Sequence, residues 1–378
     1  MSKRILFLSG TRADFGKLKP LIQEVGKTPG FDYQIFATGM HLLSRYGNTV
    51  NEIFKSGFEP VFTYMNQVEG EDMDIILANT IMGLNRYLHE NPVDLIVVHG
   101  DRVEALAGAT VGALKNILVA HVEGGEVSGT VDELMRHAIS KLSHLHFVAS
   151  ETAQRRLIQL GEDPKSVFVI GSPDVDVMVS QELPTLGEVR ARYDINFLDY
   201  GLALLHPVTT ELEKQEEHAN RFVEALIASG KSYVVVYPNN DHGSGEIFSA
   251  LKRLENNKRF RLFPSLRFEY FLTLLKNASF IIGNSSAGIH EAPIYGVPTV
   301  NIGKRQYKRL SCESIFNVEF DVSEILSTLS TAVNNGPFPP LWHYGEGKSA
   351  ERFIEALAGR IWDVPNQKHF QDLEFSHD

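Results

Sequence analysis

Short apolar runs that end in polar, often Gly-containing turns recur along this chain and limit the folds it can adopt. They read ILFL before SGTR, DLIVV before HGDR, NILVA before HVEGGE, GLALL before HPVTT, SYVVV before YPNND and SFII before GNSSAGIHE. Each run has the length and the Val, Ile, Leu and Phe content of a strand buried on both faces. Because ligands bind at the carboxyl ends of parallel strands, the charged and hydroxyl residues there predict an enzyme site assembled from many strand ends.

The alternation of strand-like apolar runs with helical patterns occurs once in each half of the chain, which predicts two domains. The length of 378 residues also exceeds the usual size of one domain. We expect strands at 5–8, 33–38, 95–99, 117–121, 146–149, 167–170, 201–205, 233–237, 261–263, 280–282 and 299–302. Helical patterns cover 17–26, 74–88, 103–114 and 131–142. The expected fold class is therefore α/β, with two doubly wound Rossmann-like domains facing each other across a cleft.

Prolines mark the expected borders between the parts of the chain. The segment GSPDVDVMVSQELPT carries two prolines, so we place a hinge there, and NNGPFPPLW is a second break. The borders that follow are an N-terminal domain at 1–173 and a C-terminal domain at 174–348. The remaining segment, 349–378, is expected to form a helix that packs back across the hinge.

The composition narrows the classes of function. Hydrophobic residues make up 43% and charged residues 22%, as in ordinary soluble globular proteins. The net charge of −11 argues against a general nucleic-acid-binding surface and against an anionic membrane as partner. The lone cysteine, Cys312, excludes an internal disulfide and favours a reducing, cytoplasmic compartment. No apolar stretch is long enough to cross a bilayer.

The motif GNSSAGIHEAPIYGVP is the strongest sign of a phosphate site. A strand ends at Gly283, Ser285 and Ser286 follow in a turn, and a helix is expected to begin near Gly288. Free amides at a helix start attract anions, and hydroxyl groups add donors. Glu291, about one turn later, is placed to accept hydrogen bonds from ribose hydroxyls. The alternative is that a serine here simply caps the helix, and a cap and a phosphate use the same amides.

A second strand–turn–helix motif, SGTRADFGKL, lies near the N-terminus. It has neither the GxGxxG spacing of a dinucleotide site nor the pattern of a P-loop, so no nicotinamide cofactor is expected. Arg12 at the strand end is suited to clamp a diphosphate, because its planar fork matches phosphate oxygens. The alternative is a surface ion pair between Arg12 and Asp14.

Carboxylates gather after two neighbouring strands of the first half. HGDR supplies Asp101, and HVEGGEVSGTVDELMRH supplies Glu123 and Asp132. Crowded carboxylates can raise one another's pKa and so provide an acid and a base near neutral pH. The alternatives are structural ion pairs for Asp101 and Glu123 and a favourable helix N-terminus for Asp132. The same stretches also contain Arg102, Glu126, Glu133, Arg136 and His137.

Two strand-end histidines carry weaker signals. His206 in LLHPVTT and His41 in TGMHLL are expected to face the site. A histidine at a strand end is as often hydrogen-bonded within the protein, so this alternative stays open for both.

Two further patterns point toward metals and are set aside. Asp174 and Asp176 form the DxD of metal-dependent glycosyltransferases, but they lie in the expected hinge, where we interpret them as a solvated turn. His144 and His146 alternate on one face, with no carboxylate or cysteine at metal-ligand spacing. We therefore expect no catalytic metal.

Taken together, SGTRADFGKL, TGMHLLSRYGNT, VHGDRVEALAGA, HVEGGEVSGTVDELMRHAISK, HPVTT, YPNND and GNSSAGIHEAPIYGVP resemble the hydrolysing UDP-N-acetylglucosamine 2-epimerases of sialic-acid biosynthesis. The resemblance extends from the N-terminus to about Arg309. The run after HVE is similar to the hydrolysing branch and differs from non-hydrolysing relatives. The family implies a glycosyltransferase-B-like fold, no metal, no nicotinamide cofactor and conversion of UDP-GlcNAc and water to UDP and N-acetylmannosamine.

The resemblance also implies roles for individual residues. Asp101, Glu123 and Asp132 become the catalytic carboxylates of the N-terminal domain, and His206 becomes a contact to the leaving diphosphate. The C-terminal domain becomes the UDP-binding part. The substrate-binding residues expected from the match are Arg12, Lys17, His41, Arg102, Arg136, Asn239, Leu266, Phe271, Ser285, Ser286, Glu291 and Arg305. One position departs from the family, because His290 stands where relatives often have arginine.

Three alternatives to this reading stay open. The same reaction could act on UDP-linked 2,4-diacetamido-2,4,6-trideoxyglucose for legionaminic acid. A retaining glycosyltransferase of the same fold would use a similar UDP site but would need an acceptor. A non-catalytic UDP-sugar-binding protein would not need three carboxylates together. In each case the expected partner is a UDP-sugar, and the expected assembly is a homodimer or homotetramer.

Overall fold

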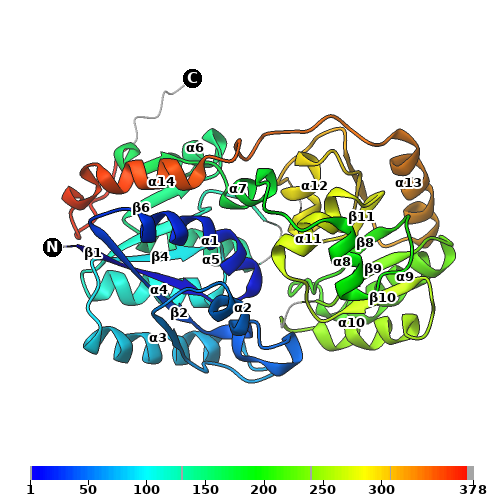
Figure 1. Ribbon diagram of the computed structural model, residues 1–378, viewed down its shortest axis with the longest axis horizontal. Coiled ribbons are helices and arrows are strands. Elements are labelled where there is room, and N and C mark those ends of the chain that lie inside the picture. Colours follow the sequence, from blue (N-terminus) through cyan, green and yellow to red (C-terminus); the bar gives the residue numbers. More distant parts are fainter. Residues whose placement is uncertain (1, 129–130, 239–240, 307, 373–378) are drawn as a thin grey trace. The chain divides into compact units, whose positions relative to one another are not determined.

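The computed structural model describes residues 2–128, 131–238, 241–306 and 308–372. The chain divides into two compact units, each with its own parallel sheet and helices (Figure 1). Unit 1 comprises Met1–Glu126, Asp132–Val179 and His343–Asp378, and unit 2 comprises Val127–Val131 and Ser180–Trp342.

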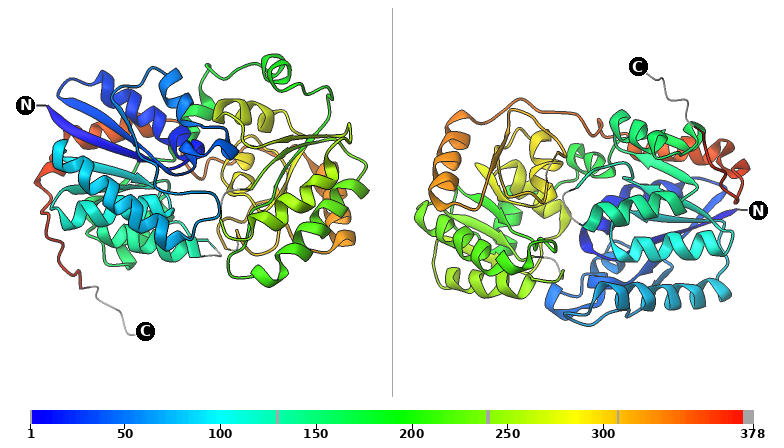
Figure 2. Two further views of the ribbon diagram at one scale, coloured as in Figure 1. Left: turned by 90° about the horizontal axis from the view of Figure 1, so that it is seen from below. Right: turned by 180° about the vertical axis from the view of Figure 1, so that it is seen from behind.

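Unit 1 contains a seven-stranded parallel sheet with the strand order β3-β2-β1-β4-β5-β6-β7. The strands are β1 (Lys3–Ser9), β2 (Phe31–Ala37), β3 (Val61–Thr63), β4 (Leu95–His99), β5 (Leu118–Val122), β6 (Leu145–Val148) and β7 (Val167–Val169). This order begins in the middle of the sheet and winds outward to both edges, which is the Rossmann arrangement. Crossover helices consequently cover both faces, as Figures 1 and 2 show.

The helices of unit 1 connect these strands and close the chain. They are α1 (Arg12–Lys27), η1 (Gly39–Leu42), η2 (Ser44–Tyr46), α2 (Val50–Lys55), α3 (Met73–Glu90), α4 (Val103–Leu114), α5 (Val131–Leu142), α6 (Glu151–Gln159), η3 (Pro164–Ser166), α7 (Pro173–Val179), α14 (Ser349–Ala358) and η7 (Arg360–Asp363). Although it lies far along the chain, α14 packs against α1 and α7 within this unit.

The central strand β1 shows why its run from Ile5 to Leu8 is apolar at every position. Ile5 and Phe7 enter the core beneath α1 and α14, while Leu6 and Leu8 enter the core beneath α3 and α4. All four side chains are buried. A strand with helices on both faces has no solvent-facing side, so apolar and polar residues do not alternate along it.

Unit 2 repeats the plan with a six-stranded parallel sheet in the order β10-β9-β8-β11-β12-β13. Its strands are β8 (Gly201–Leu204), β9 (Tyr233–Val236), β10 (Phe260–Phe263), β11 (Phe280–Gly283), β12 (Thr299–Ile302) and β13 (Ile315–Val318). Its helices are α8 (Leu186–Tyr193), η4 (Leu212–Lys214), α9 (Gln215–Ala228), α10 (Ser244–Leu251), η5 (Lys252–Leu254), α11 (Phe268–Lys276), η6 (Ser286–Gly288), α12 (Glu291–Ile294) and α13 (Val322–Asn335). Its main core joins β8 and β9 to α9, α10 and α13.

The structure confirms the expected α/β class with two doubly wound parallel sheets, and it adds two edge strands that the sequence pattern did not reveal. β3 and β13 are short and only partly buried, so neither forms a continuous apolar run. Within the described residues, no helix has both the length and the apolar character needed to cross a membrane.

The solvated turn expected at Asp174 and Asp176 is wrong. Both residues lie in α7, and the Asp174 side chain is only 1% exposed. Asp176 accepts hydrogen bonds from the amides of Ser349 and Ala350 at 2.9 and 2.8 Å, at the start of α14. Because α7 packs against α1 and α14, it belongs to unit 1, and the border expected after residue 173 falls inside this helix.

Candidate active site

The carboxyl ends of β4 and β5 place two acidic residues at the same edge of the unit 1 sheet. His99 pairs in register with Val122, and the Gly100 amide donates to the Val122 carbonyl at 3.0 Å. Gly100 adopts φ 73°, and Asp101 follows it in the turn after β4. Glu123, directly after β5, adopts φ 61°, which is unusual for a residue with a side chain. Such backbone strain is concentrated at functional sites in proteins.

A buried network of three ionisable groups includes Glu123. The Nε2 atom of His99 lies 2.9 Å from Oε2 of Glu123, and its Nδ1 atom lies 3.2 Å from Oδ1 of Asp14. Asp14 sits in the first turn of α1, and its amide donates to the capping hydroxyl of Thr11 at 3.1 Å. The strand end and the helix start therefore hold one imidazole between two carboxylates.

The charges in this network follow from its geometry. Burial alone would lower the pKa of His99, but the charges of Glu123 and Asp14 and the hydrogen bonds to both raise it to about 9. Burial alone would raise the pKa of Asp14, but the hydrogen bond and charge of His99 hold it below its ordinary value. His99 is therefore an imidazolium at neutral pH, and it stabilises the ionised form of each carboxylate beside it.

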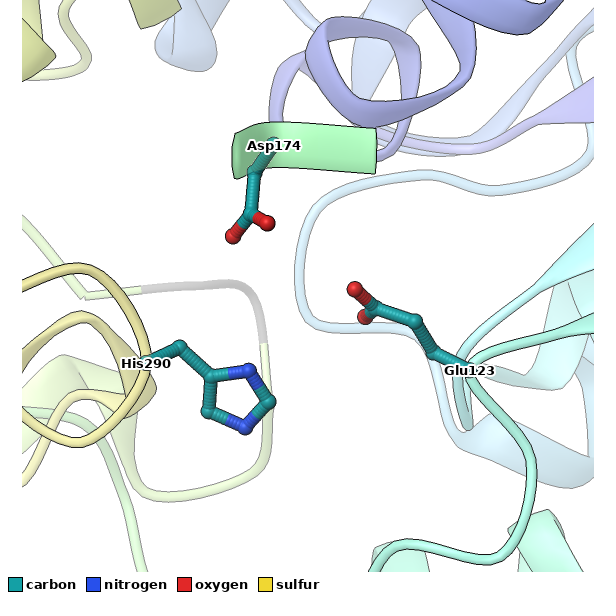
Figure 3. Close-up of side chains that lie close together, drawn as sticks. All are labelled: Glu123, Asp174 and His290. Carbon is teal, nitrogen blue, oxygen red and sulfur yellow. The ribbon is translucent and has the colours of Figure 1, made fainter. Parts of the chain in front are cut away.

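Glu123 has two further partners and an acidic neighbour. Ser172 donates to its Oε1 atom, and the ammonium of Lys17 lies 3.4 Å from its Oε2 atom. The same ammonium lies 3.2 Å from Asp174, and oxygens of the two carboxylates lie within 4.8 Å of each other. Figure 3 shows both carboxylates pointing into the same space; His290, also drawn there, belongs to unit 2. Lys17 thus supplies positive charge where two carboxylates approach.

Helix α5 contains Asp132 and contacts Asp101, the two other acidic residues expected to carry chemistry. Arg136, which is 2% exposed, donates to the Asp101 carboxylate. Asp132 lies half-buried in the first turn of α5. The ion pair expected as the alternative role of Asp101 is therefore present in the structure. An arginine that fixes a strand-end carboxylate also holds that carboxylate in position to react.

His121 secures the turn before Asp101. Its Nε2 atom lies 2.8 Å from the Gly100 carbonyl, so Nε2 carries the proton, and its Nδ1 atom lies 3.0 Å from the Ser140 hydroxyl on α5. Burial lowers the pKa of His121 to about 3, so the ring is neutral. An added Cβ at Gly124 would lie 2.8 Å from this ring, so protein packing already requires glycine there.

The expected phosphate-binding arginines of unit 1 have protein partners. Arg12 lies 3.7 Å from Glu52 on α2, not in an ion pair with Asp14, which contacts His99 instead. Arg102 lies 3.4 Å from the buried Glu104. The two guanidinium groups, at the starts of α1 and α4, thus each lie beside a carboxylate.

His41 has the geometry of a structural histidine. Its ring nitrogens lie 2.8 Å from the hydroxyls of Ser9 and Thr49, and the residue is fully buried. Burial lowers its pKa to about 4. This geometry agrees with the alternative in which His41 is hydrogen-bonded within the protein.

In unit 2, Asn284 joins the ends of the neighbouring strands β8 and β11. Its side chain accepts from the His206 amide at 2.7 Å and donates to the His206 carbonyl at 2.9 Å. Its carbonyl accepts from Gln306 at 3.0 Å and from Arg305 at 3.4 Å. His206, Asn284 and Arg305 are therefore brought to one edge of this sheet.

The serine turn follows at the same edge. The Ser285 hydroxyl accepts from the Ala287 amide at 3.3 Å at the start of η6, so the expected capping role is present. Ser286 begins η6, and Glu291 begins the short helix α12 and is buried. The regular helix thus starts later than the expected Gly288, because one 3₁₀ turn comes first.

The remaining expected contacts in unit 2 are apolar or undescribed. Leu266 precedes α11 and Phe271 lies within it, and both are buried. Asn239 lies outside the described residues.

Sequence reasoning missed four members of the Glu123 network: Asp14, His99, Ser172 and Asp174. His99 stands at a strand end directly before Gly100, so its position was a usable signal. Asp14 was considered only as a partner of Arg12, and Asp174 was assigned to a solvated hinge. Ser172 carries no signal in sequence, because it reaches Glu123 from a distant segment.

Comparison with known proteins places this arrangement in a family. A family model described as UDP-N-acetylglucosamine 2-epimerase matches residues 23–358. The chain belongs to the UDP-N-acetylglucosamine 2-epimerase family. A protein of that name from Neisseria meningitidis serogroup B is 46% identical over 375 residues, which cover 98% of this chain and 99% of that protein. A UDP-N,N'-diacetylbacillosamine 2-epimerase (hydrolyzing) from Legionella pneumophila is 33% identical and covers 94% of this chain and 96% of its own.

Solved structures of family members share the fold. The Methanocaldococcus jannaschii UDP-GlcNAc 2-epimerase, solved with UDP-GlcNAc and UDP, matches with a TM-score of 0.80 at 23% identity, over 94% of this chain and 99% of that one. The Neisseria meningitidis UDP-GlcNAc 2-epimerase bound to UDP-GlcNAc matches with a TM-score of 0.78 at 19% identity, with the same coverage. The expected UDP-N-acetylglucosamine 2-epimerase family and its glycosyltransferase-B-like fold are thereby confirmed.

Proposed function

We propose that this chain is a hydrolysing 2-epimerase that converts UDP-GlcNAc and water to UDP and N-acetylmannosamine for sialic-acid-type sugar synthesis. The observation that carries the chemistry is the Asp14–His99–Glu123 network at the strand ends of unit 1, beside Asp101. Two relatives support the hydrolysing type and the pathway: the Legionella protein named above, and the Escherichia coli polysialic acid biosynthesis protein P7, which is 31% identical.

The reaction requires an elimination, because no carbonyl group acidifies the C2 hydrogen of the sugar. A carboxylate removes this proton while UDP leaves C1, which gives a 2-acetamidoglucal. Water then adds at C1, and a second group returns a proton to the opposite face of C2. Glu123, in hydrogen-bond contact with His99, suits the base, while Asp101 and Asp132 are the other proton-transfer groups.

We assign UDP to the strand ends of unit 2. Amides and hydroxyls at Ser285 and Ser286 suit the diphosphate, and the buried Glu291 suits the ribose hydroxyls. If so, Glu291→Ala should weaken UDP binding by roughly 1–3 kcal/mol, since buried hydroxyls would lose their partner. Calorimetric titration with UDP measures this, and an unchanged dissociation constant would remove the ribose assignment.

NMR of the reaction in D2O tests the whole proposal. With UDP-GlcNAc alone, the expected products are UDP and N-acetylmannosamine with deuterium at C2. Oxygen-18 from labelled water should enter the sugar and not UDP, because the C1–O bond breaks. Formation of UDP-N-acetylmannosamine as the stable product would show a non-hydrolysing enzyme. Turnover that depends on an added sugar acceptor would instead indicate a glycosyltransferase.

A second substrate has a specific observation in its favour, namely the Legionella relative, whose name specifies UDP-N,N'-diacetylbacillosamine. Measurement of kcat/KM for both UDP-sugars separates the two. We expect UDP-GlcNAc to be preferred, because the more similar Neisseria relative is named for it.

We also propose a cytoplasmic homodimer or homotetramer. Several exposed apolar side chains of unit 1 support an assembly: Phe62, Met65, Val68, Ile75 and Met82. Size-exclusion chromatography with light scattering gives the mass in solution, and a monomer at micromolar concentration contradicts this proposal.

A further inference from the structure

The segment that follows η7 forms a strap, residues 364–372, along unit 1. The Asn366 side chain donates to the Asn116 carbonyl at 2.8 Å, after α4. The His144 ring, between α5 and β6, donates from Nε2 to the Asn366 carbonyl at 2.9 Å. Figure 2 shows this segment, in dark red, continuing from the C-terminal helices toward the end of the chain. The strap is thus attached at two points before it reaches Lys368.

Lys368 inserts its ammonium at the C-terminal end of α5. Its Nζ atom lies 3.3, 3.0 and 2.6 Å from the carbonyls of Ser140, Lys141 and Ser143. The last carbonyls of a helix lack intrahelical partners and carry partial negative charge, so a cation there satisfies and stabilises them. Lys368 therefore caps α5 from a distant part of the sequence.

A buried carboxylate fixes this ammonium. Glu162 contacts Lys368, and it also lies 2.9 Å from the His146 ring and 2.8 Å from Lys141. Burial alone would raise the pKa of Glu162, but the hydrogen bonds from His146, Lys141 and Lys368 lower it to about 2. The side chain of Glu162 is 1% exposed, so solvent screens these charges weakly.

The capped helix is also the element that holds Asp101. From α5, Arg136 donates to the Asp101 carboxylate, and Ser140 contacts His121, which holds the Gly100 carbonyl. Ser140 also contacts Lys368, because its carbonyl is one of the three carbonyls that the Lys368 ammonium caps. A shift of the last turn of α5 therefore changes both supports of Asp101.

We propose that Lys368 is a positioning residue, and that the strap holds α5 in the register that places Asp101 for proton transfer. The role of Asp101 rests on the proposed function. Lys368 does not touch the reacting groups; it acts through the last turn of α5. The strap thereby makes the C-terminal segment part of the catalytic apparatus.

Three single variants test the assignment. K368M removes the charge at similar length, K368R keeps it, and K165M is the matched control, since Lys165 is an exposed lysine of the same unit. We expect K368M to lower kcat about tenfold, the effect of one charge-assisted contact, with KM and UDP affinity unchanged. K368R should recover most of the rate, and K165M should match wild type. A K368M rate equal to that of K165M would overturn the proposal.

Non-additivity separates positioning from general loss of stability. In a double-mutant cycle with S140A, the rate of K368M/S140A should be close to that of the slower single variant, because both changes loosen one connection. Fully additive losses would contradict the proposal. If K368M folds poorly, N366A takes its place in the test. This variant removes one attachment of the strap and should lower kcat in the same direction by a smaller factor.

Hydrogen exchange supplies a readout that does not depend on activity. In K368M, peptides covering 134–143 and 98–104 should exchange faster than in K165M, while the rest of unit 1 stays unchanged. If the wild type does not convert UDP-GlcNAc, the proposed function fails. The exchange measurement still tests whether the strap supports α5 and the turn that carries Asp101. Unchanged exchange at 98–104 would refute the connection to Asp101 whatever the substrate.

Discussion

His99 lies between two carboxylates of unit 1, those of Glu123 and Asp14, and its charge acts on both. Burial lowers its pKa, but the charges of Glu123 and Asp14 and the hydrogen bonds to both outweigh this and raise the pKa from 6.5 to about 9. A raised pKa stabilises the folded state fully below pH 6.5, and this contribution is lost as pH rises to about 9. We therefore expect wild type to exceed H99Q in unfolding free energy at pH 6, and the difference to shrink above pH 6.5.

Urea unfolding of both proteins across this pH range measures the effect. H89Q is the matched control, because the His89 side chain is 80% exposed on α3. It should follow wild type at every pH. A difference between wild type and H99Q that stays constant from pH 6 to 9 would show that folding does not raise the pKa of His99, and one that grows with pH would show that the ring is neutral when folded.

Glu123 is predicted to carry chemistry, not nucleotide binding. Glu123→Gln removes the base but keeps the shape of the side chain, so kcat should fall at least about a hundredfold, the low end for loss of general acid–base catalysis. UDP affinity should stay within about twofold, since UDP is assigned to unit 2 and a twofold change is under 0.5 kcal/mol. Glu151→Gln, at an exposed position of unit 1, serves as control. Parallel loss of UDP binding and turnover would point to a structural role.

At the scale of elements, α7 and α14 depend on each other through one carboxylate. Asp176 accepts from the first amides of α14, which have no partner within that helix. Asp176→Ala should lower the unfolding free energy by about 1–2 kcal/mol, the usual cost of losing such a cap. Asp72→Ala is the control, because Asp72 precedes α3 without a capping hydrogen bond from its side chain. Equal urea midpoints for the two variants would mean that the cap contributes nothing.

The elements differ in how well the sequence predicted them, and the reason is burial. β4, β5 and β8 are buried throughout and β1 is buried from Ile5 onward, so each produces a continuous apolar run that ends at a polar turn. The sequence did not predict α7, because its acidic residues suggested a solvent-exposed turn. In the structure Lys17 pairs with Asp174, and amides of α14 donate hydrogen bonds to Asp176. Partners from distant segments cannot be read from local composition.

At the scale of the whole molecule, topology predicted which strand ends meet, but not which side chains pair. The order of strands in each Rossmann-like sheet brings Asp101 next to Glu123 and His206 next to Asn284. The sequence did not predict contacts between segments that are distant along the chain. Examples are the hydrogen bond from Ser172 to Glu123 and the contact of the strap with the end of α5. These contacts come from segments separated by tens or hundreds of residues, where spacing carries no information.

Charge balance in unit 1 leads to a last prediction, on metal dependence. The two carboxylates that approach each other, Glu123 and Asp174, already share the ammonium of Lys17 at 3.4 and 3.2 Å. A divalent ion bound to both would have to lie against this ammonium, and like charges at such a distance repel. Turnover of UDP-GlcNAc should therefore survive exhaustive dialysis against EDTA, and added Mg²⁺ or Mn²⁺ should not raise kcat. In Lys17→Met the ammonium is gone, so Mn²⁺ should bind the variant more tightly than wild type in a titration followed by electron paramagnetic resonance. Activity lost with EDTA and restored by Mn²⁺ in the wild type would instead make Asp174 a metal ligand and give the DxD sequence a catalytic role.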